Sequence, residues 1–251
     1  MDGLRSSLSF FTVFPVRSPE LRGKMVYFLS IIGMILGGIS GLLYFLGATF
    51  LNSFVGSSLA VISVLILSGF NHLDGVLDSG DAIMARTTTS VKLKILKDHN
   101  VGAGAIGVAF SLYLLMVAFL SYLPPVSGAI AVILAEIMSK LSFIVFFKSA
   151  RIIETSRLGR FFEKSISERW GGSLIWNFSA ISLIFLILPG VAFPALLITL
   201  IVTYISRRRM YLSFGGVNGD LAALNGEMVR LSVIIFISLY CALGSGLPLY
   251  L

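Results

Sequence analysis

The sequence predicts an all-α integral membrane protein, a polytopic bundle of about seven transmembrane helices with a cytoplasmic N-terminus. Of its 251 residues, 57% are apolar and 12% are charged, and the mean hydropathy is +0.96. Soluble domains carry roughly 25% charged residues, so this composition excludes an ordinary soluble protein. We expect one domain, 1–251, in which residues 1–25 form a cytoplasmic or interfacial segment before the first span.

Seven apolar stretches approach the roughly 20 residues that a helix needs to cross a bilayer. The fifth and sixth are joined only by Pro189-Gly190. They are therefore either two spans with a tight hairpin or one broken pair of shorter segments. The predicted spans are 26–51, 54–73, 101–122, 125–147, 172–188, 191–206 and 229–250.

The positions of the basic residues support this arrangement. All 19 Lys and Arg except Lys140 lie before the first span, in the connections 74–100 and 148–171, or among residues 207–230. The alternate connections, near 52–53, 123–124 and 189–190, contain no Lys or Arg. This is the charge bias expected when the basic segments are cytoplasmic and the C-terminus is outside. The formal charge of +7 therefore reflects membrane topology and does not indicate a nucleic-acid partner.

Three aspartates at the end of the second predicted span are the strongest candidates for chemistry. Asp74, Asp78 and Asp81 are spaced i, i+4, i+7, so a helix would place them within about 60° on one face. Carboxylate oxygens suit Mg²⁺, which would also relieve the repulsion among them. A solvated acidic helix end is the other interpretation, but the basic and glycine-rich sequence that follows favours a metal site.

A fourth carboxylate, Asp98, follows the basic loop after this segment. We expect the loop to bring Asp98 opposite the other three, so that the four hold one or two Mg²⁺ ions. Asp81 is the predicted general base, because it is the most distal of the three and lies nearest the cytoplasm. His72, two residues before Asp74, is the alternative base, although a histidine beside acidic residues is more often structural.

A glycine-rich segment follows Lys97 and Asp98. Gly102, Gly104 and Gly107 would let the backbone approach a phosphate, and a helix that begins there would turn its positive end towards an anion. The alternative is a packing seam of small residues between membrane helices. Asp98, directly ahead of the glycines, favours contact with a ligand.

The fourth predicted span and the residues after it carry further polar groups. Glu136 and Lys140 are i, i+4, the favourable order for an ion pair, and a buried structural pair is expected. Arg151 lies just outside this span. Its guanidinium group fits the inner-leaflet charge bias, and it would also suit a phosphate.

The segment before the last predicted span contains Asn218, Asp220 and Glu227. Asp220 and Glu227 are i, i+7, and together they would complete a second oxygen-rich site. A polar loop with a helix cap is the other interpretation. The candidate substrate contacts from all segments are Lys97, Gly102, Gly104, Arg151, Asn218, Asp220 and Glu227.

These segments together resemble the adenosylcobinamide-GDP ribazoletransferase family, also called cobalamin-5′-phosphate synthase. The resemblance rests on HLDGVLDSGDA, KLKILKDHNVGAGAIG and GGVNGDLAALNGE, with FFTVFPV and EIMSKLSFIVFFKSAR as further signatures. It spans nearly the whole chain, in the family's order. Lys140, where the family usually has arginine, and Asn218, where threonine is also common, depart from the pattern without removing a carboxylate.

The resemblance implies a phosphoryl transfer that depends on Mg²⁺. A ribose hydroxyl of α-ribazole, or of its 5′-phosphate, attacks the cobinamide-linked phosphate of adenosylcobinamide-GDP, and GMP leaves. All 12 acidic residues except Glu136 fall in the predicted cytoplasmic segments or at their membrane edges. We therefore expect an enzyme of the cell membrane that works at the inner leaflet, as a single copy or as a homo-oligomer.

Three rival functions predict different residues. A CDP-alcohol phosphotransferase of phospholipid synthesis also places spaced aspartates at a membrane edge, but here Arg86 follows Gly75 by eleven residues, which is the wrong spacing. A cation-coupled transporter needs acidic groups at mid-bilayer, and only Glu136 qualifies. A seven-helix retinal receptor would need a lysine in the last span, and 231–251 contains none.

Overall fold

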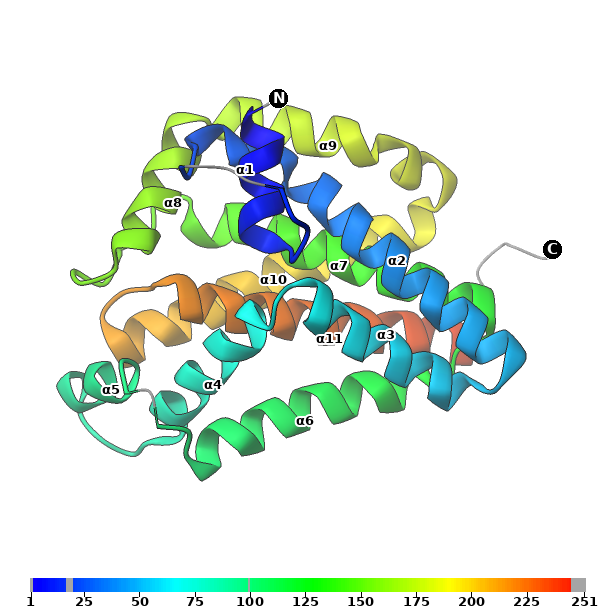
Figure 1. Cartoon of the computed structure of the whole chain (residues 1–251), viewed down its shortest axis with the longest axis horizontal. Coiled ribbons are helices and arrows are strands. Elements are labelled where there is room, and N and C mark those ends of the chain that lie inside the picture. Colours follow the sequence, from blue (N-terminus) through cyan, green and yellow to red (C-terminus); the bar gives the residue numbers. More distant parts are fainter. Residues whose placement is uncertain (1, 17–19, 99, 245–251) are drawn as a thin grey trace.

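The structure is a computed structural model that describes residues 2–16, 20–98 and 100–244, and the regular secondary structure within these ranges is helical (Figure 1). This confirms the predicted all-α class. The elements are α1 (Asp2–Phe11), the 3-10 helix η1 (Gly23–Phe28), α2 (Leu29–Phe50), α3 (Ser53–Leu67), α4 (Asn71–Met84), α5 (Thr89–Ile95), α6 (Ala103–Leu120), α7 (Pro125–Phe147), α8 (Arg157–Glu168), α9 (Trp170–Ile187), α10 (Pro189–Phe214) and α11 (Gly219–Ala242).

Six candidate spans lie in the described part of the chain, or seven if the bent pair α3–α4 counts as one. They are η1 with α2, then α6, α7, α9, α10 and α11. The two interpretations of the Pro189 region are thereby resolved, because α9 and α10 are separate helices that meet at Leu188. The chain is a polytopic helical membrane protein. Residues 245–250 of the last predicted span lie outside the described residues.

The second predicted span, 54–73, is wrong at its C-terminal end. α3 ends at Leu67, and α4 continues from Asn71 with its direction changed by 93°. The turn contains Gly69 and Phe70, whose φ angles of 64° and 58° are left-handed. Such residues cannot continue a right-handed helix, so the chain turns away before the aspartates. In Figure 1, α4 runs from this turn towards α5 at one end of the bundle.

The last span begins earlier than predicted. Residues 219–228 were expected in a polar connection before residue 229, but they form the first turns of α11. Asn218 caps this helix, with its Oδ1 accepting from the backbone N–H of Leu221 at 2.9 Å. The cap that the sequence offered as one interpretation is therefore confirmed, and Glu227 is buried inside the bundle.

A seam of glycines joins α2 to α7. A β-carbon added at Gly33, Gly37 or Gly41 would lie within 3.0 Å of α7 backbone atoms; at Gly37 the nearest is Ile133 Cα at 2.8 Å. Residues spaced by four lie on one face of a helix, and small residues there let two backbones approach closely. The small-residue packing considered for the segment at 102–107 is thus found in α2, and it also occurs at Gly104 and Ala105, which lie against Gly80, Asp81 and Met84 of α4.

The bundle has two different ends (Figure 1). The α2–α3 turn and the C-terminal end of α6 lie at one end. At the other, α5 lies near the end of α4 and the start of α6, and residues of α5, the segment before α8 and the start of α11 line a common cavity. Most candidate residues for chemistry gather at this second end.

Candidate active site

Helix α4 is packed between α11 and α6, and its glycines make this possible. A β-carbon at Gly75 would lie 2.7 Å from Ala223 Cβ and 3.1 Å from Asp220 Cα, and one at Gly80 would lie 2.9 Å from Ala105 Cα. Both neighbours therefore come close to the backbone of α4. The carboxylates of α4 are held against the start of α11 at one side and the start of α6 at the other.

Asp74 and Asp220 form an acidic pair between α4 and α11. The backbone of α4 lies against Asp220, since a β-carbon added at Gly75 would be 3.1 Å from Asp220 Cα, and the negative charge of Asp74 acts on Asp220. None of the ion pairs among the described residues includes either aspartate. Asn218 Nδ2 donates to Asp220 Oδ2 at 2.6 Å, which orients that carboxylate. Two like charges in this position favour a cation between them. Asp78 lies one turn from Asp74 and is half-buried.

Asp81 has a different environment from the rest of the predicted triad. Its Oδ2 accepts from the N–H of Gly102 at 2.6 Å, and its Oδ1 accepts from the N–H of Ala105 at 2.9 Å. The carboxylate thereby caps the N-terminus of α6, where a negative charge is favourable. Gly102 and Gly104 leave room for it, since an added β-carbon would lie 2.7 Å and 2.9 Å from Asp81 Oδ1. The helix end predicted to receive a phosphate receives Asp81 in this structure.

Asp98 lies in an exposed local turn. Its Oδ1 accepts from the backbone N–H and from Nδ2 of Asn100, at 3.1 and 2.7 Å. Within the residues that the structure describes, no three or more His, Cys, Asp or Glu side chains are arranged to hold a metal ion. The predicted four-carboxylate cradle thus stays a prediction, and the closest approach to it is the acidic pair of Asp74 and Asp220.

A polar cavity of about 240 Å³ lies next to the acidic pair. It is formed by α5, the residues before α8 and the start of α11. Lys97 and Arg157 supply its positive charge, and Asn218 and Asp220 also line it. Lys97, Asn218 and Asp220 were predicted as substrate contacts, and the structure brings them together. Arg157 was not singled out, because in the sequence it is one of several basic residues in a cytoplasmic segment.

Arg151 does not line this cavity. Its N–H donates to Tyr211 Oη at 3.1 Å, and its carbonyl accepts from the N–H of Val217 at 2.9 Å, while the residue itself is exposed. Its backbone therefore anchors the loop before α11. Arg157, the first residue of α8 and preceded by the cap Ser156, has the position predicted for Arg151.

A buried chain of ionisable side chains runs through the bundle. His72 Nδ1 lies 2.9 Å from Glu227 Oε1, and His72 Nε2 lies 2.8 Å from Lys140 Nζ. Arg230 pairs with both Glu227 and Glu136. All five residues are at most 9% exposed, so each charge needs the partner it has.

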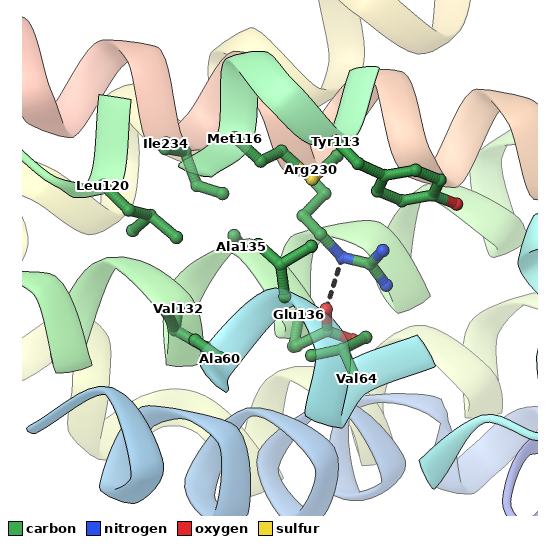
Figure 2. Close-up of a pocket in the computed structure, with 11 residues that line it drawn as sticks. Ala60, Val64, Tyr113, Met116, Leu120, Val132, Ala135, Glu136, Arg230 and Ile234 are labelled. Atoms are coloured by element: carbon green, nitrogen blue, oxygen red, sulfur yellow. Dashed lines mark ion pairs between the residues drawn. The ribbon is translucent and has the colours of Figure 1, made fainter. Parts of the chain in front are cut away.

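The contacts within this buried chain of side chains correct two predictions. Glu136 was expected to pair with Lys140 on the same helix, but its partner is Arg230 of α11, as Figure 2 shows. Glu227 was expected among the substrate contacts, but it is buried against His72 and Arg230. Arg230 was missed, because its position at the predicted membrane edge gave it the appearance of an ordinary cytoplasmic charge.

Comparison with known proteins gives a consistent result. The family model described as cobalamin-5-phosphate synthase matches residues 3–238. Three relatives are named adenosylcobinamide-GDP ribazoletransferase. The protein of Thermoplasma acidophilum is 31% identical, over 100% of this chain and 96% of its own length. That of Picrophilus torridus is 34% identical, over 94% and 97%, and that of Clostridium botulinum is 30% identical, over 91% and 95%.

No solved structure matches the chain. The family match covers the aspartates of α4, the polar cavity and the buried chain of charges, and it does not favour a phospholipid phosphotransferase. On this evidence, the chain belongs to the cobalamin-5-phosphate synthase family.

Proposed function

We propose that this chain joins α-ribazole, or its 5′-phosphate, to adenosylcobinamide-GDP and releases GMP. A ribose hydroxyl oxygen forms the new bond to the cobinamide-linked phosphorus, and the bond from that phosphorus to the GMP oxygen breaks. The hydroxyl proton passes to a base. The observation that carries the proposal is the acidic pair, Asp74 and Asp220, beside a cavity whose charge comes from Lys97 and Arg157.

The acidic pair suits a divalent metal ion. Asp74 of α4 and Asp220 of α11 influence each other as like charges, neither has an ion-pair partner among the described residues, and Asn218 orients Asp220. Hard oxygen donors of this kind are the ligands that Mg²⁺ takes in proteins. We assign Mg²⁺ to Asp74 and Asp220, with Asp78 as the nearest further donor. When bound, Mg²⁺ neutralises phosphate charge and activates the attacking hydroxyl. That Asp81 and Asp98 also bind the metal stays a prediction.

The polar cavity suits the diphosphate of the GDP-linked substrate. Lys97 contributes a point charge and Arg157 a guanidinium fork, which together match phosphate oxygens. The predicted general base, Asp81 or alternatively His72, stays a prediction. In this structure both oxygens of Asp81 accept from α6, and both ring nitrogens of His72 have partners.

We place the site on the cytoplasmic side of the cell membrane, with the N-terminus cytoplasmic, from the distribution of basic residues. Single cysteines at residue 52 and at residue 163, in a variant without Cys241, test this placement. A membrane-impermeant thiol reagent added to intact cells should label position 52 only. Labelling of position 163 from outside would reverse the orientation.

The activity itself is tested with purified protein in nanodiscs. Adenosylcobinamide-GDP, α-ribazole 5′-phosphate and Mg²⁺ should give GMP and a complete corrinoid in equal amounts, and α-ribazole should be tried in parallel. CDP-alcohols with a lipid acceptor are the control substrates. Turnover of the lipid substrates without release of GMP from the corrinoid would overturn the proposal.

A further inference from the structure

A second and larger cavity lies at the same end of the bundle as the polar one. It encloses about 660 Å³ between the end of α4, the start of α6, the end of α10 and the middle of α11. This volume is within the range of roughly 300–1,000 Å³ typical of small-molecule pockets. No part of the proposed metal and phosphate site uses it.

The lining of this cavity is apolar, with a small number of polar groups. Met84, Met210, Met228 and Phe214 are among its apolar lining residues, and Arg209 is its charged residue. Thioether side chains adapt to the shape of a ligand and make favourable contacts with aromatic rings. The lining therefore suits a flat aromatic group whose polar end lies near one cation.

The cavity adjoins the active-site region at two places. Gly104 lines it and directly faces Asp81, since an added β-carbon would lie 2.9 Å from Asp81 Oδ1. Helix α5 connects it to the polar cavity: Lys92 lies 5.9 Å from the ring centre of Phe214 in the apolar cavity, and Lys97, just after α5, lines the polar one.

We infer that the apolar cavity binds the aromatic base of the ribazole substrate. This rests on the proposed function, which requires two substrates with different chemistry at one end of the bundle. The GDP-linked substrate brings a charged diphosphate, for which the polar cavity is suited. The ribazole brings a bicyclic aromatic base, for which the apolar cavity is suited, and Arg209 is available to the phosphate of the phosphorylated form.

Gly107 offers a test that leaves the packing of the protein unchanged. It lines the cavity, yet a β-carbon added there would have no atom within 4 Å. Gly107→Leu therefore adds bulk at the cavity from a position with open space around its β-carbon, and it replaces a residue that is unfavourable in helices. Gly38→Leu is the matched control, because Gly38 in α2 also has no neighbour within 4 Å and lies outside the cavity.

Both variants are assayed in nanodiscs beside the unsubstituted protein. In Gly107→Leu, the apparent KM for α-ribazole 5′-phosphate should rise at least tenfold, and equilibrium binding of radiolabelled α-ribazole should weaken by a similar factor. The KM for adenosylcobinamide-GDP and the Tm should match those of Gly38→Leu. Unchanged ribazole binding and KM in Gly107→Leu would overturn the inference.

Native mass spectrometry distinguishes the other possible occupant. If a phospholipid remains bound to the unsubstituted protein and is lost in Gly107→Leu while ribazole kinetics are unchanged, the cavity is a lipid site and the inference is wrong. These outcomes are separate from the proposed function. An active protein with an unaffected Gly107→Leu variant refutes only the cavity, whereas an unsubstituted protein that releases no GMP refutes the function.

Discussion

The seam between α2 and α7 and the side of α6 that faces the apolar cavity use glycine in opposite ways. In α2, Gly37 removes a side chain so that the backbone of α7 can lie against it. In α6, Gly107 removes a side chain beside a cavity, where nothing approaches. The first arrangement gives close helix packing, and the second gives space for a ligand. Close packing of α2 on α7 provides the fixed surface against which α11 holds the charged groups.

Of all the substitutions considered, those of the acidic pair, on the ligand-binding side of this comparison, should have the largest effect. Asp74→Asn and Asp220→Asn each keep the side-chain shape and remove one negative charge from the proposed metal site. Activity should fall at least about a thousandfold, since metal ions stabilise the charge of phosphoryl transfer by several kcal/mol. The measurement is the rate of GMP release over a range of Mg²⁺ and Mn²⁺ concentrations.

The control for this prediction is Glu168→Gln in α8, a half-exposed carboxylate away from the cavities. It should retain full activity. Asp98→Asn sharpens the result, because a comparable loss there would favour the four-carboxylate cradle predicted from the sequence. Near-normal activity of the variants at both 74 and 220 would remove the metal from this pair.

Substitution within the glycine seam should have the next largest effect, on stability. In Gly37→Leu, the new β-carbon would lie 2.8 Å from Ile133 Cα, and the backbone of α7 cannot move aside as a flexible side chain can. Overpacking of this kind typically destabilises by about 1–3 kcal/mol, and occasionally by more. Thermal unfolding in detergent should show a clearly lower Tm for Gly37→Leu than for its neighbour Gly38→Leu. Equal Tm values would mean that the seam is not tightly packed.

A smaller effect is expected at the polar cavity. Arg157→Lys keeps the charge but loses the planar fork that binds two phosphate oxygens. Loss of about 1.4 kcal/mol corresponds to a tenfold weaker affinity, so the apparent KM for adenosylcobinamide-GDP should rise about tenfold. Arg151→Lys is the paired variant, and its backbone contacts survive the change. A rise for Arg151→Lys alone would restore the assignment made from the sequence.

The smallest effect concerns the cap of α6. Asp81→Ala removes the acceptor for two backbone N–H groups and should lower stability by about 1 kcal/mol. Asp81→Asn keeps one acceptor oxygen and should recover part of this loss in thermal unfolding. If Asp81 instead acts as a metal ligand or base, Asp81→Asn will lose activity as strongly as Asp74→Asn while its Tm stays near that of the unsubstituted protein.

The parts of the fold that depend on local sequence were predictable. Apolar length located most of the membrane helices, and the i, i+4, i+7 spacing placed the aspartates on one helix. The Asn218 cap was also readable, because capping depends on residues three positions apart. The direction of the chain after Leu67 could not be predicted. The turn needs a left-handed backbone conformation at Phe70, and residues with bulky side chains rarely adopt that conformation.

Individual residues of the site could be predicted from the sequence, but their grouping in space could not. Lys97, Asn218 and Asp220 had the right chemistry, but the sequence could not show that they share a cavity. Arg157 lines the cavity and Arg151 does not, because of the position of α8, which nothing in their local sequence indicates. Glu136 had a partner of the right charge one turn away, and only the contact between α7 and α11 shows that it binds Arg230 instead.

The pairing of Glu136 with Arg230 of α11, and not with Lys140 of its own helix, has a consequence for membrane insertion. Helix α7 carries Glu136 with Lys140, and α11 carries Glu227 with Arg230, so each helix has no net charge from these groups before it meets the other. An unpaired charge at the bilayer centre costs about 2.5–3.5 kcal/mol on insertion scales. Each helix can therefore enter the bilayer with its charges paired internally. The ion pair between Glu136 and Arg230 joins two helices, so it can form only once α7 and α11 are both in place.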